Sequence, residues 1–189
     1  MLTCTNKSIT NIEPDLLKKQ LSITHESTVY CFAGRRNEVK GYDRFINFVS
    51  KQMELDKNVF ALILGPSDSN FTIPVGPNWL DVGWCNNPHD YINVCDFFVL
   101  PNKSTYFDLI ALEVLSLNKK IILSYTGGNK VFSEYTTDDI YFLDDNNNFN
   151  NKCNKNENCK KYNSNIELFE ALFDIDKFAI NYLKIYEKN

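Results

Sequence analysis

The chain has 189 residues and a net charge of −4 at pH 7, with 43% hydrophobic and 14% aromatic residues. This length suits one large domain, or one domain with appendages, and the composition excludes disorder over most of the chain. Acidic and basic residues are interspersed, so the charge gives no electrostatic basis for binding nucleic acid or an anionic membrane surface. Any phosphate-binding site must therefore be local.

The sequence contains no run of about 18 apolar residues, and its first residues lack the charged and apolar regions of a signal peptide. We therefore expect a cytoplasmic protein with no integral membrane segment. None of the six cysteines forms a CxxC pair, and Cys31, Cys85 and Cys95 lie in or beside apolar segments. Buried reduced thiols are the favoured interpretation, and a metal site is not supported. Only Cys153 and Cys159 are a pair to watch.

Apolar and amphipathic segments alternate along most of the chain. Strands are predicted at β-branched and aromatic runs, and helices where apolar residues recur on one side. The strands are expected at 28–33, 59–64, 78–84, 96–100, 121–123 and 140–143, and the helices at 14–21, 42–53, 89–94, 106–117, 130–135, 166–173 and 175–186. About six strands alternating with helices predict an α/β fold with a doubly wound parallel sheet. Residues 1–26 are expected to be a lead-in segment, and residues 144–165, rich in Asn and Lys, a mobile surface insertion.

A basic loop follows the first predicted strand. It carries Arg35, Arg36 and Lys40 between Gly34 and Gly41, and these glycines permit tight turns and a close approach of backbone to a ligand. An arginine can grip a phosphate through two hydrogen bonds, and a lysine supplies a mobile point charge. The loop therefore indicates a phosphate site, although a solvated turn can have the same composition.

The predicted helix at 106–117 offers a second phosphate contact. Thr105 can cap this helix and Asp108 lies in its first turn, where free N–H groups and the positive end of the helix dipole attract anions. An ordinary helix start has the same pattern. Glu113 lies on a largely apolar helix, so its carboxylate must reach solvent or find partners, and the hydroxyls of a ribose are one candidate.

Two further features could contact a nucleotide. Trp84 ends the third predicted strand, and Asn86 and Asn87 follow it. The ring could stack on a nucleobase and the amides could hydrogen-bond to it. Core packing of Trp84 is the alternative. Gly127 and Gly128 form a turn after the fifth strand. The usual dinucleotide, P-loop and hydrolase motifs are missing, which argues against those classes.

Taken together, these residues resemble the C-terminal, donor-binding domain of the family 4 retaining glycosyltransferases of GT-B fold. The resemblance covers nearly all of residues 27–187. The segment FAGRRNEVKG at 32–41 is similar to the family's Gly-Arg and Lys-Gly phosphate loop. The segment VCDFFVLPNKSTYFDLIALEVLSLNKKIILSYTGG is similar to its block adx-fvlPS-x-x-E-x-FGL-x-x-LEA-x-x-x-G-x-PVI-x-s-x-x-GG. The resemblance implies one Rossmann-like half of a GT-B enzyme.

The resemblance also implies roles for individual residues. Arg35 and Lys40 would grip the donor diphosphate, and Glu113 would hold the ribose as the second Glu of the family's E-x7-E pair. Thr105 stands in place of the first Glu, and Asp108 in place of the glycine of FGL. The expected catalytic residues are Arg35, Lys40, Thr105 and Glu113, and the expected donor-binding residues are Gly34, Arg35, Lys40, Trp84, Asn86, Asp108, Leu109, Ile110, Glu113, Gly127 and Gly128.

The implied function is the transfer of a sugar from a nucleoside diphosphate sugar to a glycan or lipid-linked acceptor in polysaccharide biosynthesis, with no cofactor or metal. Family members carry an acceptor-binding domain before this one, so we expect the chain to lack its N-terminal GT-B half and to be inactive alone. Any attachment to a membrane would come through that half or through the acceptor. One alternative is a non-catalytic nucleotide-binding or scaffolding protein derived from such a domain. A different doubly wound protein, such as an epimerase or a flavodoxin-like module, is less favoured because its phosphate loop would be spaced differently.

Overall fold

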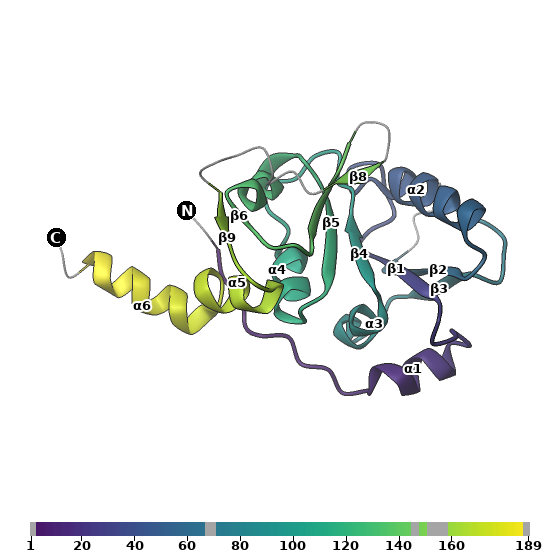
Figure 1. The fold of residues 1–189 in the computed structure, drawn as a ribbon, viewed down its shortest axis with the longest axis horizontal. Helices are drawn as coiled ribbons and strands as arrows, with labels where there is room; N and C mark the ends of the chain where they lie inside the picture. The colour runs from purple at the N-terminus through teal and green to yellow at the C-terminus, as the bar shows by residue number, and fades with distance from the viewer. Residues whose placement is uncertain (1–2, 67–70, 145–147, 151–158, 187–189) are drawn as a thin grey trace.

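The structure, a computed structural model, describes residues 3–66, 71–144, 148–150 and 159–186. Its centre is a parallel sheet of six strands in the order β3-β2-β1-β4-β5-β7, with helices on both faces (Figure 1). A short strand, β8, extends the sheet antiparallel to β7. The chain is therefore α/β and Rossmann-like, with the doubly wound sheet that the sequence predicts.

The strands are β1 (Thr28–Ala33), β2 (Val59–Leu64), β3 (Trp79–Gly83), β4 (Phe97–Leu100), β5 (Lys120–Ser124), β6 (Tyr135–Thr136), β7 (Ile140–Leu143), β8 (Phe149–Asn150) and β9 (Lys160–Lys161). The helices are α1 (Pro14–Gln20), α2 (Tyr42–Leu55), α3 (Pro88–Val94), α4 (Leu109–Ser116), α5 (Asn165–Leu172) and α6 (Ile175–Tyr186), with a 3-10 helix, η1 (Gly127–Ser133). The predicted bounds of β1, β2, β7 and α6 are confirmed.

The strand order explains which helices share a face of the sheet. In right-handed crossovers, the face that a helix covers depends on the direction in which the chain moves across the sheet. The chain moves one way from β1 to β2 and the other way from β3 to β4 and β5. Accordingly, α2 packs on β1 through Phe45 against Phe32 and through Phe48 against Tyr30. In contrast, α3 and α4 pack on the opposite face with Val29 and Cys31. Both faces are covered, which is why the strands are apolar runs rather than alternating ones.

Helix α4 begins at Leu109, three residues later than predicted. Asp108 precedes it in an extended conformation and is its N-cap residue, and no side chain caps the helix. The ring of Phe107 packs on that of Phe132 in η1, with centroids 6.1 Å apart. This contact holds the segment before Asp108 against η1 and out of the helix. The predictions that Thr105 caps the helix and that Asp108 lies in its first turn were therefore wrong.

The two glycines predicted to form a turn lie within η1 itself. Gly127 has a φ of 48°, and a Cβ atom there would overlap the carbonyl oxygen of Thr105. A Cβ atom on Gly128 would overlap the carbonyl oxygen of Tyr106. The close backbone approach that these glycines permit is therefore an approach to the chain itself.

Replacing Gly127 with alanine should lower the free energy of unfolding by about 2 kcal/mol, because the new Cβ atom meets backbone in a left-handed conformation. Gly83→Ala is the matched control, since Gly83 also has a positive φ, 67°, but a Cβ atom there would meet nothing within 4 Å. The control should lose only about 1 kcal/mol. Urea denaturation measures both values, and equal losses would show that the close approach at Gly127 has no energetic role.

The N-terminal segment lies along α3 and α4. The backbone N–H of Ser8 donates to Oγ of Ser116 at 3.1 Å, and the backbone N–H of Asn11 donates to Oδ1 of Asp90 at 2.6 Å. Asp90 is buried, so the second bond satisfies a carboxylate that would otherwise be costly to bury. Residues 5–11 are thus held against the helical face by specific hydrogen bonds.

Most of the Asn- and Lys-rich segment lies outside the described residues. Its described parts pair with the fold, β8 with β7 and β9 with β6. Tyr162 and Asn165 at its end are buried, and the Asn165 side chain donates to the carbonyl of Lys119 at 2.6 Å. The prediction of a surface insertion was therefore wrong for these residues. Cys159 is disulfide-bonded, whereas Cys153 lies outside the described residues.

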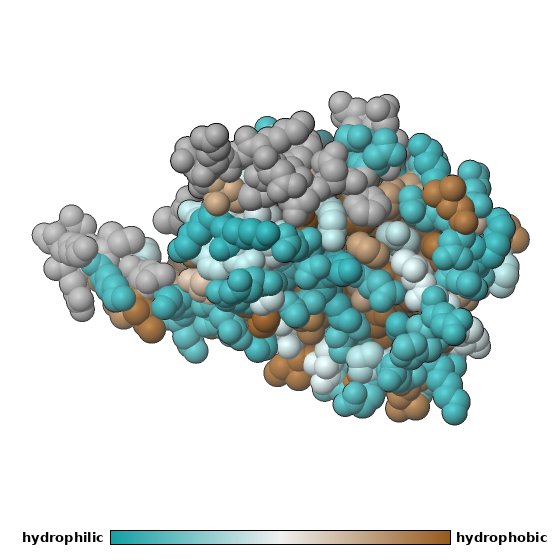
Figure 2. Space-filling model, viewed as in Figure 1, coloured by the Kyte–Doolittle hydropathy of each residue, from teal (hydrophilic) through white to brown (hydrophobic). Residues whose placement is uncertain are grey.

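The face shown in Figure 2 is mainly hydrophilic, with hydrophobic residues in separate patches. Helix α6 extends away from the sheet (Figure 1) and exposes Ile180 and Leu183, which are 48% and 60% accessible. Among the described residues, none of the helices combines the length and the apolar character that crossing a membrane requires. Within the same residues, no three His, Cys, Asp or Glu side chains come together as ligands for a metal ion.

Candidate functional site

A cavity of about 560 Å³ opens where β1, β2 and β3 end, beside the start of α4. In open α/β sheets, ligands bind in the crevice outside the carboxyl ends of the strands. Most of the residues that the sequence assigns to donor binding line this cavity: Gly34, Arg35, Lys40, Trp84, Asn86, Asp108, Leu109 and Ile110. Three separate stretches of the sequence, at 34–40, 84–86 and 108–110, therefore meet at one cavity.

The basic loop reaches α4 because it packs closely on the loop after β4. Gly41, the N-cap residue of α2, has a φ of 68°, and a Cβ atom there would overlap the carbonyl oxygen of Pro101. Only glycine fits at such an approach. One residue earlier, Nζ of Lys40 lies 2.6 Å from Oδ1 of Asp108 at the start of α4. The ammonium group is thus placed beside the positive end of the helix dipole, although the two residues are 68 positions apart.

Asp108 links the basic loop to the start of α4 through Lys40. Its second carboxylate oxygen accepts a hydrogen bond from the side-chain amide of Asn102, which is buried. The Lys40 and Asp108 side chains are 31% and 16% exposed, so the ion pair is partly screened by solvent. Leu109 and Ile110 also line the cavity, and their backbone N–H groups belong to the first turn, which has no intrahelical acceptor.

The two arginines of the basic loop have different environments. The Arg36 side chain is only 2% exposed, and its guanidinium pairs with both carboxylate oxygens of Asp81 and donates to the carbonyl of Gly65 at 3.1 Å. This bidentate pair ties the loop to the ends of β2 and β3. Arg35 lines the cavity instead. Arg36 is therefore a structural residue, and Arg35 and Lys40 are the cations of this loop that face the cavity.

The Trp84 side chain is not part of the core. It is 78% exposed and lines the cavity, as does Leu109, which is 49% exposed. The alternative of core packing is therefore wrong. An exposed indole at the edge of a cavity is a surface on which a flat ring can stack. Cys85, next to Trp84, also lines the cavity, and burial raises the pKa of its thiol, with a smaller contribution from the charge of Asp90.

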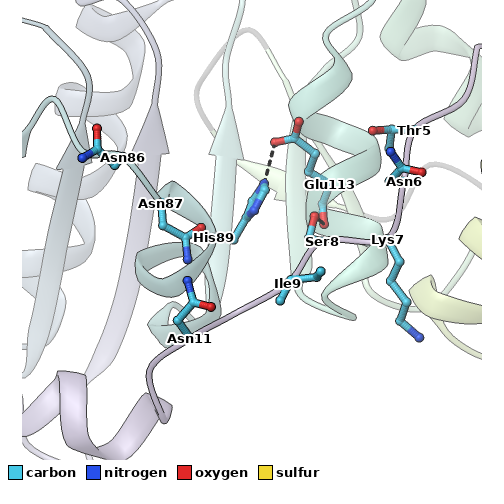
Figure 3. A pocket seen from close by; sticks show the side chains of 10 residues that line it. All are labelled: Thr5, Asn6, Lys7, Ser8, Ile9, Asn11, Asn86, Asn87, His89 and Glu113. Carbon is cyan, nitrogen blue, oxygen red and sulfur yellow. Dashed lines mark hydrogen bonds and ion pairs between the residues drawn. The ribbon is translucent and has the colours of Figure 1, made fainter.

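Glu113 faces a second cavity of about 540 Å³, shown in Figure 3. Its Oε2 lies 3.1 Å from Nε2 of His89, the contact drawn as a dashed line. Asn86 lines both cavities, whereas residues 5–9 of the N-terminal segment line only the second. The sequence does not by itself indicate this pair, because His89 and Glu113 are 24 positions apart. The crossover rule, which places α3 and α4 on one face, is the signal that could have suggested this pair.

The remaining expected residues lie elsewhere. Thr105, Gly127 and Gly128 line neither of the two cavities. They form the contact between the β4–α4 loop and η1. The structure thus brings together the expected diphosphate contacts, except for the glycine turn, and separates them from Glu113 and Thr105.

No protein-family profile matches the chain, and no curated protein matches it in sequence. Its fold is similar to those of solved glycosyltransferases, and in the three that follow the chain covers about half of that protein's length. Sucrose-phosphate synthase from Thermosynechococcus elongatus gives a TM-score of 0.68 at 17% identity, over 98% of this chain and 51% of that one. HepE from Anabaena, in complex with UDP and glucose, gives 0.68 at 12% identity, over 98% and 56%. A glycosyltransferase from Rickettsia africae gives 0.64 at 12% identity, over 98% and 55%. The chain therefore has the fold of one Rossmann-like half of a GT-B protein.

Proposed function

We propose that the chain is the donor-binding, C-terminal domain of a family 4 retaining glycosyltransferase, which transfers a sugar from a nucleoside diphosphate sugar to a glycan or lipid-linked acceptor. The single observation that carries this proposal is the meeting of Lys40, Arg35 and the start of α4 at one cavity. Cations and free backbone N–H groups that face the same space suit a diphosphate.

The same groups have a chemical role in transfer. When the bond between the sugar and the diphosphate breaks, negative charge develops on the departing diphosphate. Cations fixed beside that position stabilise the transition state more than the ground state, which accelerates the reaction. Arg35 and Lys40 supply this charge in our proposal, so no metal ion is needed.

We assign residues to the nucleobase and the ribose of the donor from their positions around the two cavities. Trp84 and Asn86 lie on the β3 side of the cavity, and we assign them to the nucleobase. Glu113 could bind the ribose only if its carboxylate turned from His89 towards Asn86, the residue common to both cavities. HepE, one of the similar structures, was solved in complex with UDP and glucose. This supports our proposal that the ligand of this chain is a nucleoside diphosphate sugar.

The chain spans about half of the similar glycosyltransferases, and we propose that transfer requires a second GT-B half. In GT-B enzymes the reaction takes place between two such domains, so this domain alone should bind the donor but transfer poorly. The exposed apolar side chains of α6 support a further packing partner. We place the assembled enzyme in the cytoplasm.

Thr105 favours a second candidate function, a non-catalytic nucleotide-binding or scaffolding protein. Thr105 stands in place of the first Glu of the family's E-x7-E pair, and it does not line the cavity. The carboxylate that the family usually places near the donor sugar is therefore missing from this cavity. A binding protein would need only the diphosphate and base contacts. A pure scaffold would need neither.

Calorimetric titration of the folded chain with UDP, GDP and their sugars tests the proposed function. One diphosphate should bind per chain, and the corresponding nucleoside, which lacks phosphates, should bind at least tenfold more weakly, a difference of about 1.4 kcal/mol. A folded chain that binds none of these ligands would contradict the proposal and favour a scaffold.

Alkylation of Cys85 gives an independent test of ligand position. Because burial raises the pKa of this thiol, its labelling by iodoacetamide should be slow at neutral pH and should accelerate as the pH rises. A nucleoside diphosphate in the cavity should slow the labelling of Cys85. Cys4, a free and partly exposed thiol that lines neither cavity, is the internal control. Mass spectrometry separates the two sites, and no protection of Cys85 at saturating ligand would place the ligand elsewhere.

A further inference from the structure

The start of α4 already holds an anion, the carboxylate of Asp108. Nζ of Lys40 lies 2.6 Å from one of its oxygens, and the side chain of Asn102 donates to the other. The carboxylate makes no capping hydrogen bond with its own helix. The Asp108 carboxylate therefore accepts from Lys40 and Asn102, and not from the N–H groups of α4.

This arrangement changes the charge that a ligand meets. Lys40 and Arg35 face the cavity with two positive charges, and Asp108 faces it with one negative charge. A phosphate that approached Lys40 would meet a carboxylate within hydrogen-bonding distance of the same ammonium group. Like charges placed together at a partly buried interface are costly, and the cost grows with the charge of the ligand.

We propose that Asp108 is a specificity-determining residue that competes with the ligand's phosphate for Lys40 and so disfavours the more highly charged ligand. This inference rests on the proposed function and concerns the same cavity. A free nucleoside diphosphate has a terminal phosphate whose second ionisation lies near pH 6, so at neutral pH it carries about one more negative charge than a nucleoside diphosphate sugar. Asp108 therefore repels the product of transfer more strongly than the donor, and favours product release.

The variant Asp108→Asn tests the inference because it removes the charge and keeps the size of the side chain. Calorimetry with the full chain should show that UDP binds at least tenfold more tightly to Asp108→Asn than to the unchanged chain. The gain should be smaller for UDP-glucose and absent for uridine, which has no phosphate. GDP and guanosine are titrated in parallel, so that the result does not depend on which base the cavity prefers.

Two further variants support the comparison. Asp43→Asn is the matched control, because Asp43 also pairs with a lysine, Nζ of Lys103 at 2.8 Å, but does not line the cavity. It should leave all affinities unchanged. Asp108→Gly, which introduces the glycine of the FGL pattern, is the second test variant if Asp108→Asn does not fold, and it should give the same order of gains.

The outcomes separate this inference from the proposed function. If the unchanged chain binds a nucleoside diphosphate and the Asp108 variants bind it equally or more weakly, the inference is overturned and the proposed function stands. A gain for UDP no larger than the gain for uridine also overturns it, since the effect would not come from phosphate charge. If neither the unchanged chain nor the variants bind any nucleotide, the proposed function fails, and this inference fails with it.

Discussion

Replacing Lys40 with alanine should weaken the binding of a nucleoside diphosphate by about 100-fold, or roughly 2.8 kcal/mol. The variant lacks the ammonium group that, in our proposal, donates a charged hydrogen bond to the ligand. It also leaves Asp108 without its ammonium partner, so a carboxylate would face the phosphate with less compensation. Calorimetric titration measures the loss, and circular dichroism confirms that the variant is folded.

Lys103→Ala is the control for this variant. Lys103 lies on the loop between β4 and α4 but pairs with Glu38 and Asp43, away from the cavity. Its loss should change the affinity less than twofold. In the double variant Lys40→Ala, Asp108→Asn, part of the loss should be recovered, because the two residues interact and their effects are not additive. Equal affinities for Lys40→Ala and Lys103→Ala would contradict the assigned phosphate site.

Replacing Asp81 with alanine should lower the free energy of unfolding by about 3 kcal/mol. The Arg36 guanidinium is 2% exposed and has Asp81 as its counter-charge, and a buried charge without a partner is costly. Because the Asp81 side chain is itself 46% exposed, we take the low end of the usual range for such pairs. The variant should also loosen the loop that carries Arg35 and Lys40. Urea denaturation measures the stability change.

Asp43→Ala provides the comparison for Asp81→Ala. Its partner Lys103 is 36% exposed, so that pair is solvated and should contribute less than about 1 kcal/mol. The prediction is therefore a difference between two Asp→Ala variants and not an absolute value. If both variants unfold at the same urea concentration, the Arg36–Asp81 pair does not have the structural role assigned to it.

The core of the fold could be predicted because its signals are local. β1, β2 and β7 are short apolar runs bounded by polar or turn residues, and their bounds agree with the structure. The start of α4 could not be predicted, since it depends on the packing of Phe107 on η1. Two-residue strands such as β6 carry no periodic signal, because periodicity needs several residues.

The sequence identified the basic loop from its residue types, but it could not show which of the two arginines faces the cavity. Arg35 and Arg36 are adjacent and chemically identical, and the difference between them comes from Asp81, which is 45 positions away. The pairing of Glu113 with His89 depends in the same way on the packing of α3 beside α4. Such contacts between distant residues are set by the tertiary fold, which a motif does not describe.

The location of a bound diphosphate tests the central claim most directly. A crystal structure of the chain with UDP or GDP should place a phosphate oxygen about 2.7–3.2 Å from Nζ of Lys40 and from a backbone N–H at the start of α4. Asp108 should then have moved from the ammonium group. A diphosphate bound away from both Lys40 and α4 would contradict the account.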